Sequence, residues 1–463
     1  MSALMTVSEL GRAVGAREVR GDGRVGFSSV STDTRTLAAG ALFVALRGER
    51  FDGHAFAEAA VDAGAVALLV EQPVGAAVPQ IIAVDSRRAL GTGAAQWRAR
   101  FSIPVIAITG SNGKTTVTQM VGAILAQAFG EKHRLATQGN LNNEIGVPLM
   151  LWKLGRQHKA AVFELGMNHP GEIATLAEYV RPTVALVNNA QREHQEFMRS
   201  VEATAHENGE VIASLPLADA GAAVFPADDA CSGIWRALAG TRRVVDFALE
   251  GDAVVTATCE LDSDGASMSI VTPVGVLDVR LSVPGLHNVR NALAAAACAI
   301  ATDVEPAAIT AGLAAFRPVG GRGVRLRTAG GAQLIDDSYN ANPDSVRAAI
   351  ELLARCPAPR ILVLGDMGEV GDRGPEFHRE VGAHARECGL ETLLGAGTLA
   401  RQAVDAFGQG ARHYGDVDAL IADLRERLDA QTTVLVKGSR FMRMERVVRA
   451  LTAAKQAGAE DVH

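Results

Sequence analysis

Aromatic residues are scarce in this sequence. They make up 4% of its 463 residues, whereas hydrophobic residues make up 48% and charged residues 21%. The cores must therefore be built mainly from small aliphatic side chains, which suits an α/β enzyme better than a protein that stacks aromatic rings on nucleic-acid bases. At roughly 100 to 200 residues per domain, a chain of this length is expected to form about three domains.

The sequence also has no basic run, and its formal net charge is −7. Proteins that bind a nucleic-acid backbone carry clustered Lys and Arg, so no nucleic-acid partner is expected. An anionic substrate must instead be bound by local arginines and backbone N–H groups, not by the field of the whole protein.

Paired cysteines and long apolar runs are missing as well. The cysteine count of five is odd, and no C-x-x-C spacing occurs, so neither a disulfide framework nor a zinc site is indicated. Apolar runs such as 292–301 are too short to span a bilayer, and charged residues interrupt what would be a signal core at the N-terminus. A cytoplasmic protein without a membrane span is expected, as a monomer.

The alternation of buried strands with helices predicts an α/β fold of three domains. Residues 1–98 carry strand signals at 41–46 and 65–70 and a stretch of helical period from Ala55, which predicts a compact N-terminal α/β domain. Within residues 99–318, strand signals alternate with helical stretches, so a central domain with a parallel sheet is expected.

Two further patterns complete this organisation. Strands alternate with turn pairs at 253–283, which predicts a small antiparallel appendage to the central domain. The sequence PVGGRG, which begins at Pro318, indicates a hinge. After the hinge, residues 319–463 again alternate strand and helix, which predicts a Rossmann-like C-terminal domain.

A glycine-rich turn, TGSNGKTT at Thr109–Thr116, lies between a strand signal and a helix signal. The usual phosphate-loop pattern G-x-x-x-x-G-K-[ST] would need a glycine at position 108, where the sequence has Ile108. Even so, the glycines let backbone N–H groups turn toward phosphate oxygens, Lys114 adds positive charge, and the Thr115 hydroxyl can bind Mg²⁺. The alternative, a glycine turn with a surface lysine, is disfavoured by the strand before it and the helix after it.

Two candidate Mg²⁺ ligands follow later strand signals. Glu164 ends the strand signal AAVFELG, and it would lie near the phosphate loop if the two strands were neighbours. His194 comes shortly after the next strand signal. A solvated glutamate at a strand end and a surface histidine are the alternatives, and position in the sequence does not decide between them.

Four motifs, in this order, resemble those of the Mur ligases: TGSNGKTT, ELGMNHPGEI, GLHNVRNALAAAA and IDDSYNANPDS. The resemblance extends from STDTR at Ser31 to KGSRFMRMERVV at Lys437. The family's own loop, T-G-[ST]-N-G-K-T, is matched at Thr109–Thr115, which explains the mismatch at Ile108. The resemblance implies ATP and Mg²⁺ as cofactors and the formation of an amide bond through an acyl phosphate.

The text after the hinge is similar to one branch of this family. DDSYNANPDS at Asp336–Ser345 and LGDMGEVG at Leu364–Gly371 resemble the branch that joins D-alanyl-D-alanine to UDP-N-acetylmuramoyl-tripeptide, a precursor of peptidoglycan. The D-N-P-R motif of the diaminopimelate-adding branch is absent. A sibling ligase, a folylpolyglutamate synthase and a nucleotide-driven switch are the competing interpretations, and an Asx-rich turn before a helix is the structural alternative for this motif.

The resemblance also implies site residues. The catalytic residues would be Lys114, Glu164 and His194, and the Mg²⁺ ligands Thr115, Glu164 and His194. ATP would bind Thr109, Gly110, Ser111, Asn112, Gly113, Lys114, Thr115, Thr116, His287, Asn288, Asn291, Arg322 and Asp337. The two other substrates would bind Ser31, Arg35, Arg47, Thr137, Gln138, Asn140, Asn143, Asn340 and Asn342.

The sequence departs from the family at one position. Many members carry a carbamylated lysine that binds a second Mg²⁺, and its place is taken here by Asn208. No lysine occurs between Lys159 and Lys437, so no carbamate can form in this stretch. Our hypothesis is that Glu207 or a water supplies the missing ligand. The alternative is that Glu207 faces solvent.

Overall fold

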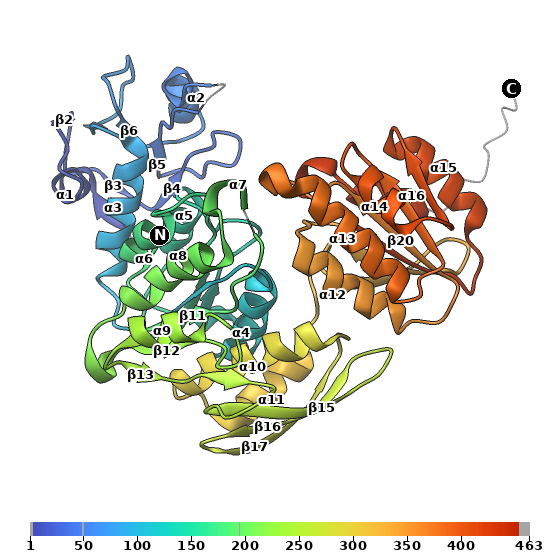
Figure 1. Ribbon diagram of the computed structural model, residues 1–463. Helices are drawn as coiled ribbons and strands as arrows, with labels where there is room; N and C mark the ends of the chain where they lie inside the picture. Colours follow the sequence, from blue (N-terminus) through green and yellow to red (C-terminus); the bar gives the residue numbers. More distant parts are fainter. Residues whose placement is uncertain (1–2, 49–50, 194, 453–463) are drawn as a thin grey trace, which may run out of the picture.

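The computed structural model describes residues 3–48, 51–193 and 195–452, which form an α/β structure with several sheets (Figure 1). The C-terminal part lies to one side of the remainder of the chain, at the right of the figure. Each of the three predicted regions has its own main sheet, and the three sheets are largely parallel.

The N-terminal sheet has five strands in the order β2-β7-β6-β5-β4, and only β2 runs antiparallel to its neighbour. A two-stranded sheet, β1-β3, lies beside it. The elements are β1 (Met5–Thr6), α1 (Val7–Ala13), β2 (Glu18–Arg20), β3 (Gly26–Phe27), β4 (Ser29–Ser31), β5 (Ala41–Val44), η1 (Gly53–Phe56), α2 (Ala57–Asp62), β6 (Ala67–Val70), β7 (Gln80–Ile82) and α3 (Ser86–Arg98).

The central sheet has six strands in the order β13-β12-β11-β8-β10-β9, and all of them are parallel, as predicted. The elements are β8 (Val105–Thr109), α4 (Lys114–Phe129), η2 (Glu131–His133), β9 (Arg134–Ala136), α5 (Gly146–Leu151), β10 (Ala160–Glu164), α6 (Glu172–Val180), β11 (Val184–Val187), α7 (Gln195–Met198), α8 (Val201–Ala213), η3 (Ala218–Ala220), β12 (Ala222–Val224), α9 (Ser232–Ala239) and β13 (Arg243–Val244).

The strand before the phosphate loop lies in the middle of this sheet. Every residue of β8 is buried, because β10 and β11 flank it and helices cover both faces of the sheet. Burial on both faces explains why Val105–Ile108 are all apolar and do not alternate with polar residues, as is usual in a parallel sheet. Since neighbouring parallel strands end at one edge, β8, β10 and β11 bring their carboxyl ends together.

The appendage differs from the prediction in one strand. β15, β16 and β17 form the expected antiparallel meander, but β14 pairs with β15 in parallel. Two helices follow this sheet. The elements are β14 (Phe247–Ala248), β15 (Val255–Leu261), β16 (Ala266–Thr272), β17 (Gly275–Leu281), α10 (Leu286–Ala301) and α11 (Pro306–Ala315).

The C-terminal sheet has six strands in the order β18-β19-β23-β20-β21-β22, and only β18 is antiparallel. Helices α12, α13 and α14 cover one face, and α15 and α16 cover the other. The elements are β18 (Val324–Arg327), β19 (Gln333–Asp337), α12 (Pro343–Ala354), β20 (Arg360–Gly365), η4 (Gly371–Arg373), α13 (Gly374–Glu387), β21 (Thr392–Ala396), α14 (Ala400–Phe407), β22 (Ala411–Tyr414), α15 (Val417–Arg427), β23 (Thr433–Lys437), η5 (Arg440–Met442) and α16 (Glu445–Thr452).

The N-terminal and central parts share a hydrophobic core, whereas the C-terminal part has separate cores. One core joins N-terminal residues such as Phe27 to one face of the central sheet, and Trp97 of α3 stacks on Trp152 with ring centroids 6.1 Å apart. The C-terminal part has two cores of its own, one on each face of its sheet. Within residues 3–48, 51–193 and 195–452, none of the helices has both the length and the apolar character needed to cross a bilayer.

The packing of α11 against α4 tests how tightly the helix after the phosphate loop is held. A Cβ built on Gly312 of α11 would lie 2.4 Å from Cα of Ile124 in α4, a backbone atom that cannot move aside cheaply. We expect Gly312→Ala to destabilise the protein by about 1 to 3 kcal/mol, the usual effect of overpacking. Differential scanning calorimetry should show a lower unfolding temperature.

Gly233→Ala in α9 is the matched control, because a Cβ there meets nothing within 4 Å. Alanine has the higher helix propensity, so this substitution should leave the unfolding temperature unchanged or raise it. An equal response of both variants would contradict the tight contact at Gly312.

Candidate functional site

The phosphate loop joins the end of β8 to the first residue of α4. Gly110 and Gly113 have φ of +128° and +81°, in the region that favours glycine. A Cβ on Gly113 would also lie 2.3 Å from Oδ1 of Asn291 and 2.6 Å from Nδ2 of Asn188. Both the backbone conformation and the close approach therefore require glycine at position 113.

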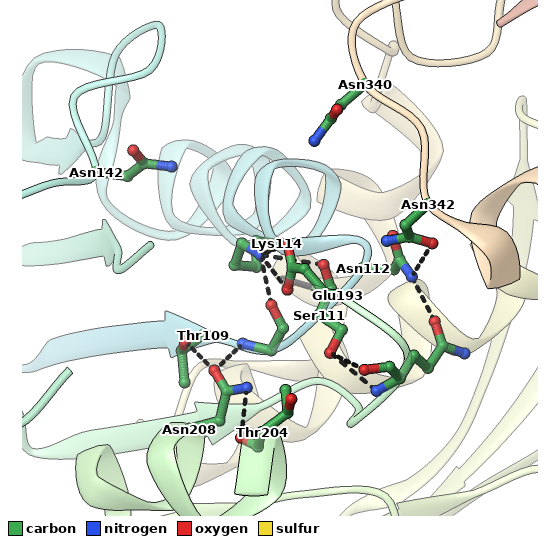
Figure 2. Close-up of polar contacts among 12 residues, drawn as sticks. Thr109, Ser111, Asn112, Lys114, Asn142, Glu193, Thr204, Asn208, Asn340 and Asn342 are labelled. Atoms are coloured by element: carbon green, nitrogen blue, oxygen red, sulfur yellow. Dashed lines mark hydrogen bonds and ion pairs between the residues drawn. The ribbon is translucent and has the colours of Figure 1, made fainter. Parts of the chain in front are cut away.

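Asn208 of α8 holds the start of this loop from below (Figure 2). Its side chain is fully buried, and Oδ1 accepts hydrogen bonds from the hydroxyl of Thr109 (2.5 Å) and the backbone N–H of Gly110 (3.0 Å). Its Nδ2 donates to the backbone oxygen of Thr204 at 3.0 Å. A neutral carboxamide thus occupies the position where the family resemblance placed a lysine.

The adjacent Glu207 does not face solvent, so that alternative is wrong. Its side chain is buried, and its two carboxylate oxygens accept hydrogen bonds from the backbone N–H groups of Gly171 (2.9 Å) and Ile173 (3.0 Å). The carboxylate therefore caps the N-terminus of α6, where negative charge is favoured by the helix dipole. Glu207 therefore has a structural role as a helix cap, and it stays a prediction that Glu207 or a water supplies the missing metal ligand.

The segment Asn188–Glu193, which follows β11 and is called the Asn188–Glu193 loop below, holds the phosphate loop from the other side. Asn188 Nδ2 donates to the backbone oxygen of Asn112 (2.8 Å), and Asn189 Oδ1 accepts from the backbone N–H of Asn112 (2.8 Å). The backbone N–H of Gln191 donates to Oγ of Ser111 at 2.9 Å. The phosphate loop is therefore fixed by hydrogen bonds from two separate segments.

Lys114 lies above this loop, and its ammonium group is bound by hydrogen bonds and an ion pair. Nζ donates to the backbone oxygens of Gly110 (2.6 Å) and Ser111 (3.1 Å) and forms an ion pair with Glu193 at 3.0 Å. The exposed fractions of the two charged side chains are 15% and 10%, so the pair lies largely away from water. Figure 2 shows both side chains beside the phosphate loop.

Glu164 lies where the sequence placed it, at the end of the strand next to β8. It pairs with Ile108 across the sheet, and only 3% of its surface is exposed, so it is not a solvated strand end. Thr137 Oγ1 accepts from its backbone N–H (2.9 Å), and Asn142 Nδ2 donates to its Oε1 (2.7 Å). Thr137 was predicted to bind substrate, and in this structure it positions Glu164.

The oxygens of Glu164 and Thr115 fit Mg²⁺, a hard cation that takes oxygen ligands and keeps several waters. Both residues line the same cavity, Thr115 at the N-terminal turn of α4. His194, the third predicted ligand, lies outside the described residues. Among the residues that the structure does describe, no group of three or more His, Cys, Asp or Glu side chains could hold a metal, so the donor set here is one carboxylate and one hydroxyl.

The N-terminal half of α10 lies against the phosphate loop and the Asn188–Glu193 loop. Asn291 is buried, and its Oδ1 accepts from Nδ2 of Asn188 at 3.0 Å. Asn288 donates to the backbone oxygen of Pro284 at 2.8 Å, and His287 is exposed toward the cavity. The helix itself begins after Gly285, so these side chains are not its N-cap.

The C-terminal sheet delivers a second set of polar groups. Lys437 at the end of β23 is buried and forms an ion pair with Asp337 at the end of the neighbouring β19 (2.5 Å). Arg322 lies over the ring of Tyr339, 4.1 Å from its centroid. Asn342 caps α12 and also donates from Nδ2 to Oδ1 of Asn112 (2.9 Å), so it serves both as a turn residue and as a contact to the phosphate loop.

A cavity of about 1440 Å³ lies between these two sheet edges. Of the predicted site residues, those that line it are Ser111, Asn112, Gly113, Lys114, Thr115, Thr116, Asn140, Asn143, Glu164, His287, Asn288, Asn291, Arg322, Asp337, Asn340 and Asn342. Sixteen residues from segments far apart in the sequence thus meet at one cavity. Thr109 and Gly110 lie at the end of β8, where both bond Asn208.

The structure does not bring the other predicted substrate residues to this cavity. Ser31 ends β4, Arg35 pairs with Asp33 (2.6 Å), and Arg47 pairs with Asp52 (3.3 Å). Gln138 accepts from Lys153 at 2.8 Å. These four side chains lie in the N-terminal and central parts, and none of them lines the cavity.

Several residues that lie at the site were not predicted from the sequence. They are Asn142, Asn188, Asn189, Gln191, Arg192, Glu193, Asp344 and Lys437. One signal was available for most of them: polar residues that directly follow a buried parallel strand lie at the ligand edge of the sheet.

Arg192 connects the Asn188–Glu193 loop to the C-terminal part. Its guanidinium pairs with Asp344 and Glu380, each at 2.6 Å, and its backbone N–H donates to Asp344 at 2.8 Å. The hydrogen bonds that Arg192 donates to Glu380 and Asp344 raise the pKa of its guanidinium above the usual range. Bidentate pairs of this kind are directional, so they fix how the two parts meet.

Comparison with known proteins agrees with this geometry. Three family models match the chain: "Mur ligase family, catalytic domain" over residues 27–98, "Mur ligase middle domain" over residues 108–299, and "Mur ligase, glutamate ligase domain" over residues 321–440. Together they cover more than half of the sequence.

Named relatives and solved structures resemble the chain along most of its length. The UDP-N-acetylmuramoyl-tripeptide--D-alanyl-D-alanine ligase of Escherichia coli (strain K12) is 43% identical, over 91% of this chain and 93% of that protein. A crystal structure of MurF from Acinetobacter baumannii has a TM-score of 0.91 at 33% identity, covering 97% and 98% of the two chains. MurF from Thermotoga maritima in complex with ADP has a TM-score of 0.80 at 26% identity, covering 92% and 97%.

The role of Asn208 can be tested by its removal. In Asn208→Ala the Thr109 hydroxyl and the Gly110 N–H would be buried without their partner, which costs about 1 to 3 kcal/mol. We expect a lower unfolding temperature in calorimetry. The control is Asn140→Ala, at an exposed position of the same cavity, which should leave the unfolding temperature unchanged. A stable Asn208→Ala variant would contradict the anchoring role.

The contact between the two parts can be tested at Arg192. Arg192→Met removes both ion pairs but keeps an apolar stem, so the C-terminal part should separate and the radius of gyration in small-angle X-ray scattering should rise. Arg373→Met is the control, because Arg373 lies over the same Phe377 ring yet pairs with Glu376, which also belongs to the C-terminal part. Identical scattering from all three proteins would contradict the contact.

Proposed function

This chain belongs to the Mur ligase family, and on that basis we infer that it joins D-alanyl-D-alanine to UDP-N-acetylmuramoyl-tripeptide. It is an ATP-dependent ligase of peptidoglycan precursor synthesis, and the products are the UDP-muramoyl-pentapeptide, ADP and phosphate. The observation that carries this conclusion is a phosphate loop that faces a second polar sheet edge across one large cavity.

The reaction needs a phosphate because a free carboxylate is a poor electrophile. We propose that the terminal carboxylate of the tripeptide attacks the γ-phosphorus of ATP in line, which breaks the bond to ADP and gives an acyl phosphate. The amine of D-alanyl-D-alanine then attacks the acyl carbon, loses a proton, and phosphate leaves. Lys114 and the N–H groups of the phosphate loop stabilise charge on the transferring oxygens.

Positioning does most of this work, and the residues described above supply it. Glu164 and Thr115 would hold Mg²⁺ beside the phosphate loop, together with His194. When bound, Mg²⁺ neutralises charge on the phosphate oxygens. Closure of the two sheet edges over the cavity keeps water from the acyl phosphate, which water would otherwise hydrolyse.

The other predicted site residues are assigned to ATP or to the peptide substrates by their positions in the structure. We propose that Asn288, Asn291 and His287 lie around the adenine, and that Arg322 and Asp337 contact the phosphates and ribose. Asn140, Asn143, Asn340 and Asn342 would meet the peptide substrates in the cavity. Ser31, Arg35 and Arg47 would bind the UDP end, and Thr137 and Gln138 would lie along the path between.

We further propose domain boundaries near residues 98 and 318, a monomer, and a cytoplasmic location. The second boundary is supported by the separate cores after it, while the first is crossed by a shared core. All five cysteines are free thiols, which suits a reducing compartment.

A sibling function has less support. A Mycobacterium tuberculosis folylpolyglutamate synthase has a TM-score of 0.62 at 19% identity, which is a likeness of fold alone. Relatives that share the D-alanyl-D-alanine ligase name reach 43% identity over nearly the whole chain.

The function is tested by ADP release with each substrate given singly and then both together, in the presence of ATP and Mg²⁺. We expect ADP only when UDP-muramoyl-tripeptide and D-alanyl-D-alanine are both present, because the amine is needed to complete the turnover. A coupled spectrophotometric assay measures the release, and mass spectrometry identifies the pentapeptide.

Two results would contradict the proposal. Release with ATP alone would indicate a nucleotide-driven switch. Release with a single amino acid in place of the dipeptide would indicate a sibling ligase.

A further inference from the structure

The ammonium group of Lys114 contacts three groups of the protein. It donates to two backbone oxygens of the phosphate loop, those of Gly110 and Ser111, and to both carboxylate oxygens of Glu193 at 3.0 and 3.3 Å. An ammonium group has three N–H donors. A phosphate oxygen that is to bind Lys114 must therefore take over one of these contacts.

The three contacts differ in how readily they can be given up. Gly110 and Ser111 belong to the phosphate loop itself, which Asn208 and the Asn188–Glu193 loop hold in place. Glu193 reaches Lys114 by its side chain from the far end of the Asn188–Glu193 loop. A rotation of this side chain frees one donor without disturbing the phosphate loop.

The charges also favour exchange at Glu193. Two anions that compete for one cation repel each other, and the repulsion is strong here because the pair is largely removed from water. A bound phosphate and the Glu193 carboxylate cannot both remain in contact with Lys114 at low energy. The backbone oxygens are neutral and carry no such conflict.

We propose that Glu193 is a positioning residue for Lys114, which it holds above the phosphate loop and releases to the β- or γ-phosphate of the nucleotide. The inference rests on the proposed function, since it requires that the phosphate loop binds ATP. Its consequence is a lower nucleotide affinity than the loop alone would give. After turnover, the carboxylate can recover the lysine and so promotes the release of ADP.

The variant Glu193→Gln tests this exchange. Glutamine keeps the shape and one acceptor oxygen of the side chain but loses the negative charge, so it competes less well with phosphate. Calorimetric titration with ADP should show affinity that is about three- to tenfold tighter than in the unchanged protein, or about 0.7 to 1.4 kcal/mol by RT ln of that ratio. Glu193→Ala should change the affinity in the same direction, should the glutamine variant fold poorly.

Two controls separate this effect from a general change in charge or structure. AMP lacks the phosphates that a phosphate-loop lysine contacts, so its affinity should be the same in both proteins. Glu178→Gln removes one negative charge from an exposed position of α6 and should leave the affinity for ADP unchanged. A purely structural role of Glu193 would alter AMP and ADP binding alike.

Steady-state kinetics give a second measurement. In Glu193→Gln we expect a lower KM for ATP, stronger inhibition by ADP, and a lower kcat because ADP leaves more slowly. Unchanged or weaker binding of ADP by Glu193→Gln would overturn the inference while the proposed function stands. If the unchanged protein bound neither ADP nor ATP, the proposed function would fail and the inference with it.

Discussion

The hydrogen bonds that hold the phosphate loop from outside are the constraint on which the site depends. Glycine-rich backbone loses much conformational freedom on folding, so it keeps one shape only if other segments fix it. Asn208 does so from α8, and Asn188, Asn189 and Gln191 do so from the loop after β11. N–H groups arranged in advance can stabilise a phosphoryl group without reorganisation during the reaction.

The Asn188–Glu193 loop combines two tasks in consecutive residues. Gln191 and Glu193 contact the phosphate loop, whereas Arg192 between them pairs with Asp344 and Glu380 of the C-terminal part. The phosphate loop and the contact to the C-terminal part are therefore joined through three consecutive residues.

The sequence predicted the features that follow from regular periodicity. Alternating strands and helices predicted the parallel sheets, and the ligand edge of a parallel sheet placed Glu164 beside the phosphate loop. Hydrogen bonds between distant residues leave no such pattern. Glu207 and Asn208 are neighbours in the sequence, but successive residues of a helix point about 100° apart, so one caps α6 while the other reaches the phosphate loop. Likewise, nothing periodic marks Arg192 as the residue that meets Asp344, 152 positions later.

The shared core of the N-terminal and central parts limits how this enzyme can be recombined with its relatives. The ring of Trp152 packs against those of Phe27 and Trp97, which belong to the N-terminal part before residue 98. A chimera joined near residue 98 would pack an N-terminal part and a central part from different proteins against each other, and their side chains would not be complementary. The C-terminal part carries complete cores on both faces of its sheet and meets the rest through polar contacts. Grafting of that part alone should therefore be tolerated, and the first two parts should be inherited as one unit.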